Sequence, residues 1–347
     1  MHCHLLIPAL FPPSALTREN DPLHGAKASA LQTLLARGSC TQTPANDMEG
    51  WLCETFGVVR QQDYPVAPFS AMADGIDAKI GYWLCADPIH LAVERDQLIL
   101  TESSTFALSH SESENLITTL NQHFSADGLH FCASHPLRWY LKLEQTPAIS
   151  TQSLYQVAGH NIHTHLPRGP EELRWRALIN EVQMLLFEHP VNVARENRGE
   201  APINSVWPWG GGTLPPASSQ PFDQVWANDA LANGLAVAGN THHQALPAKA
   251  QEWLAQARQG NHLLVLDSLR PAACYGTPHA WRERLEKLEQ QWFAPLEQAL
   301  QKGAIELTLH APAPYCTQSF AVTRSSLWKL WRRQHSLIHY RPKDAEA

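Results

Sequence analysis

The sequence of 347 residues has no Cys-x-x-Cys pair and no apolar run as long as a membrane span, which takes about 20 residues. Its seven cysteines are an odd number and are scattered along the chain, which favours reduced thiols over a disulfide framework. The first residues, with His2 and His4 around Cys3, are unlike the basic start of a signal peptide. We therefore expect a soluble, cytoplasmic protein that does not associate with membranes.

An excess of positive charge is also missing. The formal net charge is -7 and the pI is near 6.2, whereas a nucleic-acid-binding surface is normally basic. The one basic cluster with aromatic residues runs from Trp328 to His335, and we expect it to cover the core as an amphipathic segment rather than to contact nucleic acid. An exposed patch around its tryptophans would instead favour a structural role in a protein complex.

The sequence has no internal repeat, and its 44% apolar content is enough for one large core or two smaller ones. Hydrophobic periodicity predicts strands that alternate with amphipathic helices. The expected strands are residues 4–10, 80–85, 90–93, 98–100, 130–132, 139–143, 262–266 and 304–309. The expected helices are residues 27–37, about 113–124, 171–188 and 281–302, and Pro295 should interrupt the last of them.

The most unusual segment is residues 189–212, which read HPVNVARENRGEAPINSVWPWGGG. Its prolines disfavour helix in the residues before them, residues 203–209 can form a short apolar strand, and the glycines at 210–212 allow a tight turn at its end. Turns of this kind often lie at the carboxyl edge of a sheet, where ligands bind. The alternative is a structural corner in which Trp207 and Trp209 simply pack.

The order of HPVN, an arginine, PIN and WPWGGG resembles the archaeal-type cofactor-independent phosphoglycerate mutases of the alkaline phosphatase superfamily. Within that group it is most similar to the bacterial RpfE-like proteins, which are often described as regulatory proteins or as mutases. The resemblance covers most of the chain. It implies an α/β fold, with helices on both faces of a core sheet and a smaller α+β domain inserted. The core would comprise residues 1–84 and 171–347, and the inserted domain residues 85–170.

The resemblance also implies two divalent metals and a serine nucleophile, because moving a phosphoryl group requires charge neutralisation and an activated oxygen. Pro8 and Ala9 stand where the family has a metal-binding Asp-Gly, and Asn46 stands where it has the serine. Cys85 replaces an arginine suited to the substrate. Three members of the catalytic set remain: Asp47, Asp267 and His310.

Two metals need roughly six or seven ligands, more than these remnants supply. We therefore expect a non-catalytic relative, a regulatory or binding protein that requires no cofactor and binds a phosphorylated small molecule or another anion, with a protein as a further expected partner. The expected ligand-binding residues are Arg138, Asn192, Arg195, Arg198, Asn204, Gly210, Gly211 and Gly212.

The alternative is a metal-dependent phosphoglycerate mutase or phosphatase, with Mn or Zn at a site rebuilt from Asp47, Asp267, His310 and other histidines. A separate zinc site is a further hypothesis, because His163 and His165 would share one face of a strand. No carboxylate or cysteine lies near these histidines in the sequence, so a polar, exposed strand is favoured there.

Overall fold

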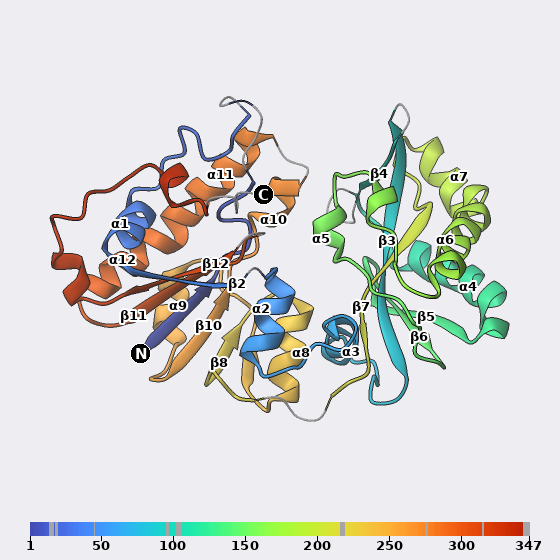
Figure 1. Ribbon diagram of the computed structural model, residues 1–347, viewed down its shortest axis with the longest axis horizontal. Helices are drawn as coiled ribbons and strands as arrows, with labels where there is room; N and C mark the ends of the chain where they lie inside the picture. Colours follow the sequence, from blue (N-terminus) through green and yellow to red (C-terminus); the bar gives the residue numbers. More distant parts are fainter. Residues whose placement is uncertain are drawn as a thin grey trace. The chain divides into compact units, whose positions relative to one another are not determined.

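The computed structural model describes residues 1–13, 17, 20–44, 46–94, 97–101, 106–215, 219–274, 277–313 and 316–342. The chain forms two compact units, one of Met1–Gly57 with Ser218–Ala347 and one of Val58–Ala217 (Figure 1). The second unit thus begins and ends outside the range expected for the inserted domain. Residues 58–84 and 171–217 belong to it rather than to the core, because both flanks contribute to the same sheet.

The first unit contains a seven-stranded sheet. In sheet order the strands are β2 (Ser39–Pro44), β12 (Cys316–Val322), β11 (Glu306–Ala311), β1 (His2–Leu6), β10 (Asn261–Val265), β8 (Gln224–Trp226) and β9 (His242–Gln244). Five neighbouring strands are parallel, so their carboxyl ends meet at one edge. β12 runs in the opposite direction beside them, and β2 pairs antiparallel with β12 at the end of the sheet.

Helices cover the two faces of this sheet. Cys3 and Leu5 of β1 pack into the main apolar core with four helices, α1 (Ser29–Arg37), α9 (Ala250–Gln256), α11 (Pro278–Leu288) and α12 (Ala294–Gln301). His4 points to the opposite face, because side chains alternate along a strand. That face carries α2 (Met48–Thr55) and α8 (Ala230–Ala238), which contact each other. The remaining elements are α10 (Arg270–Cys274), η5 (Ser325–Trp328) and η6 (Leu337–Tyr340).

The interruption expected in the long helix is confirmed. A single π-helical turn, Glu289–Phe293, separates α11 from α12, and Pro295 lies in the first turn of α12. Proline is tolerated there because the first turn has no helical acceptor for its missing N–H. No helix in the described part of the chain is both long and apolar enough to cross a membrane.

The second unit contains a five-stranded sheet built around the long strand β3 (Tyr82–Glu94). The other strands are β4 (Gln97–Thr101), β5 (Leu129–His135), β6 (Arg138–Leu143) and β7 (Ser205–Gly212). The helices are α3 (Val66–Ala73), α4 (His110–Phe124), α5 (Leu154–Val157), α6 (Glu172–Phe187) and α7 (Pro190–Asn197). Leu116 and Leu120 of α4 and Trp175 and Val182 of α6 share one apolar core with this sheet.

Two local expectations were wrong. The glycines at 210–212 continue strand β7, paired with β3, and do not form a turn after it. His163 lies in a 3₁₀ turn, η3 (Ile162–Thr164), so it does not share the face of a strand with His165. The residue before Pro190 is not helical, as expected, because α7 begins at this proline and His189 caps it by accepting a hydrogen bond from Val191 N.

Candidate functional site

Three strand ends of the first unit form the carboxyl edge at which the resemblance places the metals. Leu6 O accepts a hydrogen bond from Leu266 N (2.9 Å), and Ile7 N donates to His310 O (2.8 Å). β1 therefore runs between the strands that carry Asp267 and His310. With about 4.8 Å between neighbouring strands, these two residues lie about 10 Å apart across the sheet.

Pro8 and Ala9 follow β1 at the centre of this edge. Ala9 has a φ of 57°, a left-handed conformation that favours glycine, and its carbonyl accepts a hydrogen bond from Trp281 Nε1 (3.1 Å). The backbone is thus shaped as an Asp-Gly turn would be, but neither side chain can ligate a metal.

A buried ion pair lies near Asp267. Arg270 Nη2 donates to both carboxylate oxygens of Glu49, at 2.8 and 3.1 Å, and its Nη1 contacts Met48 Sδ at 3.3 Å. The Arg270 and Glu49 side chains are only 8% and 5% exposed. The pKa of Glu49 is raised to about 7, chiefly by burial; Arg270 opposes the rise, and Asp47 and Asp229 add to it.

Three further acidic residues lie near this ion pair. The pKa of Asp267 is raised by burial and by Asp229, while Arg270 opposes the rise. Asp47 caps α2 by accepting from Gly50 N (2.8 Å), and Asp229 caps α8 by accepting from Ala232 N (2.9 Å). The excess of carboxylates gives this edge a negative potential. Within the residues that the structure describes, no group of three or more His, Cys, Asp and Glu side chains is arranged to hold a metal ion.

Asn46 stands at the expected position of the serine nucleophile, directly before α2. Its amide lies against Gly50, in the space that a Cβ at Gly50 would need. An amide side chain can be neither phosphorylated nor deprotonated for attack. The preceding Ala45 is outside the described residues.

His310 belongs to a different cluster from Asp267. His4 Nδ1 lies 3.1 Å from His310 Nε2, and His310 Nδ1 lies 2.8 Å from Ser319 Oγ. The ring of Trp51 lies 4.7 Å from the ring of His310. Burial, with the neighbouring histidines, lowers the pKa of His310 to about 3 and that of His4 to about 4. Both imidazoles are therefore neutral, and both ring nitrogens of His310 have partners within the protein.

Three residues of this edge were missed from the sequence: Glu49, Asp229 and Arg270. Two carried a usable signal, because Asp229 closely follows β8 and Arg270 follows Asp267, and residues after parallel strands meet at one edge. Glu49 gave no such signal, because an acidic residue in the first turn of a helix is favourable on an exposed surface as well.

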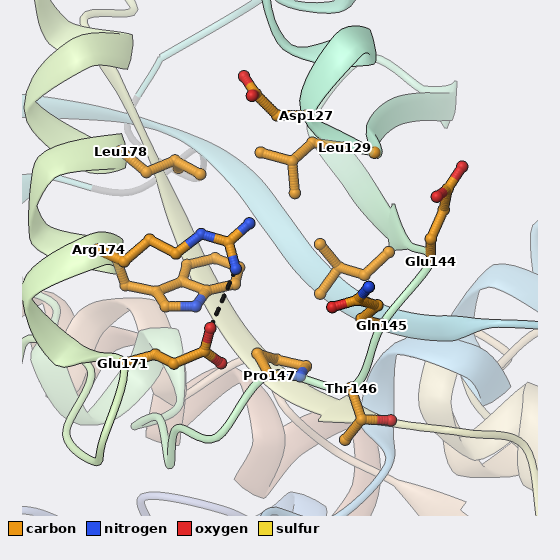
Figure 2. A pocket seen from close by; sticks show the side chains of 12 residues that line it. Asp127, Leu129, Glu144, Gln145, Thr146, Pro147, Glu171, Arg174 and Leu178 are labelled. Carbon is orange, nitrogen blue, oxygen red and sulfur yellow. Dashed lines mark hydrogen bonds and ion pairs between the residues drawn. The ribbon is translucent and has the colours of Figure 1, made fainter.

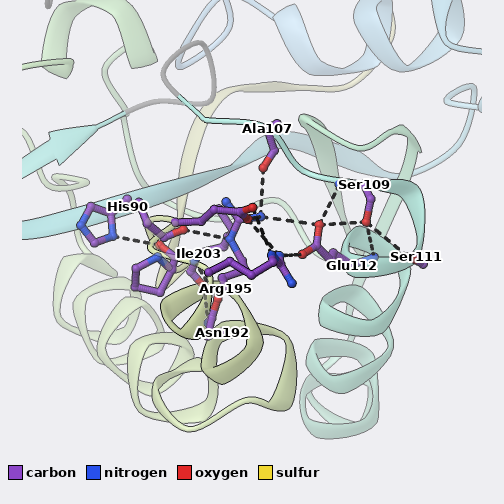
Figure 3. A network of polar contacts seen from close by, with 12 residues as sticks. His90, Ala107, Ser109, Ser111, Glu112, Asn192, Arg195 and Ile203 are labelled. Carbon is purple, nitrogen blue, oxygen red and sulfur yellow. Dashed lines mark hydrogen bonds and ion pairs between the residues drawn. The ribbon is translucent and has the colours of Figure 1, made fainter.

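The expected anion-binding residues all lie in the second unit. Arg195, in the polar network that Figure 3 shows, is the most buried of the three arginines, with 1% of its side chain exposed. Its Nε donates to Ala201 O and its Nη1 to Ala107 O, both at 2.9 Å. Its Nη1 also lies 3.5 Å from a carboxylate oxygen of Glu112 and 3.4 Å from one of Glu200. Its Nε and Nη1 therefore hold chain segments together, whereas its Nη2 is buried without a hydrogen-bond partner among the described residues.

The two asparagines of the set have main-chain partners. Asn192 donates to Leu186 O (2.8 Å) and Ile203 O (2.9 Å) and accepts from Ile203 N (2.8 Å). Asn204 exchanges two hydrogen bonds with the backbone of Leu91, at 2.8 and 3.0 Å. Both side-chain amides therefore satisfy main-chain N–H and C=O groups that would otherwise lack a hydrogen-bond partner.

The three glycines let neighbouring segments pack closely on β7: α3 at Gly210, Pro65 before α3 at Gly212, and β3 side chains at Gly211. A Cβ at Gly210, whose φ is +62°, would lie 2.8 Å from Val66 Cβ, and one at Gly212 would lie 2.5 Å from Pro65 Cβ. A Cβ at Gly211 would lie 2.5 Å from the Tyr82 hydroxyl. The glycines of this segment thus allow other parts of the protein, rather than a ligand, to approach the backbone closely.

The other two arginines of the set are partly exposed, and each already faces carboxylates. Arg198 bonds Glu112 (2.6 Å) and Glu200 (2.9 and 3.1 Å). Arg138 makes a bidentate pair with Asp74, at 2.6 and 3.0 Å. The tryptophans of the segment are bonded too, Trp207 to Gln152 O (2.9 Å) and Trp209 to the Asp87 carboxylate (2.7 Å). Ligand binding by this set stays a prediction, and its contacts favour the structural corner.

A small cavity of about 180 Å³ in the second unit is no better suited to an anion (Figure 2). Arg174, the only lysine or arginine among its lining residues, already pairs with Glu171 at 3.0 Å. Asp127 and Glu144 also line it, so its potential is negative. His165 lies elsewhere, bonded to Gln152.

No protein-family model matches the chain. It is similar to archaeal 2,3-bisphosphoglycerate-independent phosphoglycerate mutases, with 30% identity over 159 residues to that of Methanosarcina mazei, covering 44% of this chain and 39% of the relative. Identity to that of Methanothrix thermoacetophila is 39% over 73 residues, 21% of this chain and 18% of the relative. A probable mutase of Geobacter sulfurreducens is 27% identical over 132 residues, 38% of this chain and 33% of the relative. The chain thus matches about two fifths or less of these relatives.

Two solved structures share the fold over nearly the whole chain. The cofactor-independent phosphoglycerate mutase of Thermoplasma acidophilum superposes with a TM-score of 0.50 and 15% identity, covering 97% of this chain and 95% of that one. A protein of Pyrococcus horikoshii superposes with a TM-score of 0.58 and 14% identity, covering 93% and 87%. The expected alkaline-phosphatase-like α/β fold and the resemblance to these mutases are confirmed. The RpfE-like assignment stays a prediction.

Proposed function

We propose that this protein is a non-catalytic relative of the cofactor-independent phosphoglycerate mutases and that it acts by binding, as a regulatory protein. The observation that carries the proposal is the Arg270 guanidinium among the carboxylates of Asp47, Glu49, Asp229 and Asp267. This arginine supplies positive charge at the edge where the resemblance implies two divalent cations.

A guanidinium cannot replace the metals chemically. It balances negative charge and donates hydrogen bonds, but it has no open coordination position at which to polarise a phosphoryl oxygen or activate an alkoxide. The neighbouring positions lack the remaining parts, since Asn46 offers no nucleophile and Pro8 no ligand. His310, whose nitrogens both have partners, is committed to the fold as well.

The proposal is tested by metal analysis and by activity assays on the purified chain. We expect no stoichiometric Mn, Zn or Mg and no interconversion of 2- and 3-phosphoglycerate. Asp267→Ala should change neither result, and the exposed Asp127→Ala is the matched control. Two metals per chain, with turnover that Asp267→Ala abolishes and Asp127→Ala leaves intact, would overturn the proposal and support a metal-dependent mutase or phosphatase.

A phosphorylated ligand is a narrower form of the same proposal. It is supported by three arginines in the second unit, but Arg138 and Arg198 already face carboxylates and Arg195 is buried. Inorganic phosphate that raises the melting temperature through binding to the folded state would support it. Loss of that gain in Arg198→Ala would place the ligand at this arginine. A cytoplasmic location is also proposed, and it is supported by the odd number of cysteines, which are scattered along the chain without a Cys-x-x-Cys pair.

A further inference from the structure

The run from Trp328 to Arg333 does not cover the core as expected. Trp328, Leu330 and Trp331 are 73%, 69% and 77% exposed, respectively. Lys329 and Arg333 are interspersed with them, and we call these five residues the tryptophan surface. Two nearly free indoles beside basic residues are the composition of an interaction site, because Trp and Arg are enriched at the centres of protein interfaces.

The tryptophan surface is not part of a loose tail. Arg332 Nη1 donates to Gly38 O (2.8 Å), and Arg37 Nη1 donates to Leu327 O (2.7 Å). Farther along, Gln32 Nε2 donates to His335 O (2.9 Å). The segment is thus fixed to α1 and its surroundings while the two indoles point outward. Less conformational entropy is lost when a fixed segment binds.

Charge indicates what the tryptophan surface fits. Residues 324–342 contain five lysines and arginines and no aspartate or glutamate, although the whole chain has a net charge of -7. The complementary surface must therefore be apolar at its centre and acidic around it.

The second unit has such a surface on α6 and the start of α7. Met184 and Phe187 are 76% and 74% exposed, respectively. They line an open hollow of about 570 Å³. Glu188 also lines it, and no lysine or arginine does. The half-exposed Glu181 lies about one turn before Met184 on α6, where it pairs with His123 at 2.7 Å. We call this the acidic hollow. It is open to solvent, so an indole can approach Met184 and Phe187 from outside.

We propose that the tryptophan surface of one copy of this chain docks in the acidic hollow of a second copy. The two surfaces are complementary in apolar character and in charge. The indoles would pack against Met184 and Phe187, and the basic side chains would face acidic ones. Each buried tryptophan contributes roughly 150–250 Å², so the pair provides the apolar centre of an interface of about 800 Å² per partner. Because the surfaces differ, the contact is head to tail, and it closes into a ring or continues into a chain. It does not depend on whether the first unit is catalytic.

The first test is the mass of the full chain by light scattering and sedimentation over a range of concentrations. We expect species heavier than the 38.7 kDa of one chain. Trp331→Ala should weaken the association at least about tenfold, since a central tryptophan is a typical hot spot. Ile80→Ala, at another exposed apolar position, is the matched control and should leave the association unchanged.

A charge exchange makes the test specific. Arg333→Glu and Glu188→Arg should each weaken self-association, because each places like charges across the contact. A mixture of the two variants should restore it, since each surface then meets an opposite charge on the other variant. A single species of one chain up to about 0.1 mM, or association that none of these changes affects, would overturn the proposal. So would a monomer that binds anionic vesicles or RNA through Trp331.

Discussion

Arg270 in the first unit and Arg195 in the second are both buried arginines with carboxylates nearby, and their hydrogen bonds differ. Arg195 uses its Nε and Nη1 on the carbonyls of Ala201 and Ala107, so it joins segments of backbone. Arg270 directs its Nη2 at the carboxylate of Glu49, with three further acids close by. The first arrangement stabilises a corner of the fold, and the second neutralises an edge where parallel strands end.

The difference shows why residue type alone is a weak guide to an anion site. Arg195 was predicted to bind an anion because it lies in an unusual segment, yet its guanidinium bonds the protein's own carbonyls. Arg270 lies at the edge where ligands of α/β sheets bind, in a run with no unusual composition. Four predictions test this contrast.

The largest effect is expected for Arg270→Ala. Removing it leaves Glu49 buried beside three other acids, which should lower the free energy of unfolding by about 3–5 kcal/mol at about pH 8. The loss should be smaller at about pH 5, where Glu49 is protonated and carries no charge to compensate. Denaturant unfolding at both pH values measures this. The exposed Arg284→Ala is the control, and an equally small loss in both variants would show that the ion pair does not stabilise the unit.

Arg195→Ala should follow, with a loss of about 2–4 kcal/mol, because two main-chain carbonyls and two carboxylates lose a donor. Arg198→Ala, whose side chain is about half exposed, should cost much less, because solvent screens its ion pairs. Unfolding of both variants, with and without inorganic phosphate, measures the difference. If Arg195→Ala were nearly as stable as the parent and removed a stabilisation by phosphate, the segment would bind anions and the contrast would fail.

The third expected effect is a pH dependence. The folded-state pKa of Glu49 is about 7 against an ordinary value of 4.5, so the folded protein keeps a proton that the unfolded chain has lost. This contribution to stability is complete below about pH 4.5 and is lost as the pH rises to about 7. Glu49→Gln should remove the loss, so the variant should gain stability relative to the parent over this window. A constant difference between the two proteins would mean that Glu49 is already ionised at low pH.

The sequence predicted the fold better than it predicted the site. The amphipathic helices at 27–37 and 171–188 and the interruption at Pro295 followed from periodicity and backbone chemistry, which act locally. The limits of the second unit could not be predicted in this way, because they depend on the pairing of β3 with β7, which are more than a hundred residues apart in the sequence. Gly210, Gly211 and Gly212 were predicted to form a turn. Glycine is needed at these positions because neighbouring segments, α3 among them, pack closely on β7, and this packing cannot be read from the local sequence.

The site was predicted in part. Loss of the metal-binding Asp-Gly could be recognised at Pro8 and Ala9, because the change is local to one strand end. The surroundings of Asp267 and His310 could not be predicted. Arg270 bonds Glu49, which lies 221 residues earlier in the sequence, and His310 contacts His4, which lies 306 residues earlier. Such pairings depend on which strands are neighbours and not on composition.

The smallest effect on stability is expected at Ala9. Its backbone has a conformation that favours glycine, although its side chain cannot ligate a metal. Its φ of 57° costs an L-residue about 1–2 kcal/mol, whereas Gly210 in the second unit takes a similar φ at no such cost. Ala9→Gly should therefore stabilise the protein by about 0.5–1 kcal/mol, the gain being reduced by the greater freedom of glycine in the unfolded chain. Thermal and denaturant unfolding measure the change. Ala257→Gly, at a φ of -66°, is the control and should destabilise slightly. If Ala9→Gly also destabilised, packing of its methyl group against the core would outweigh the strain, and the end of β1 would be shaped by the core rather than inherited from a glycine-bearing turn.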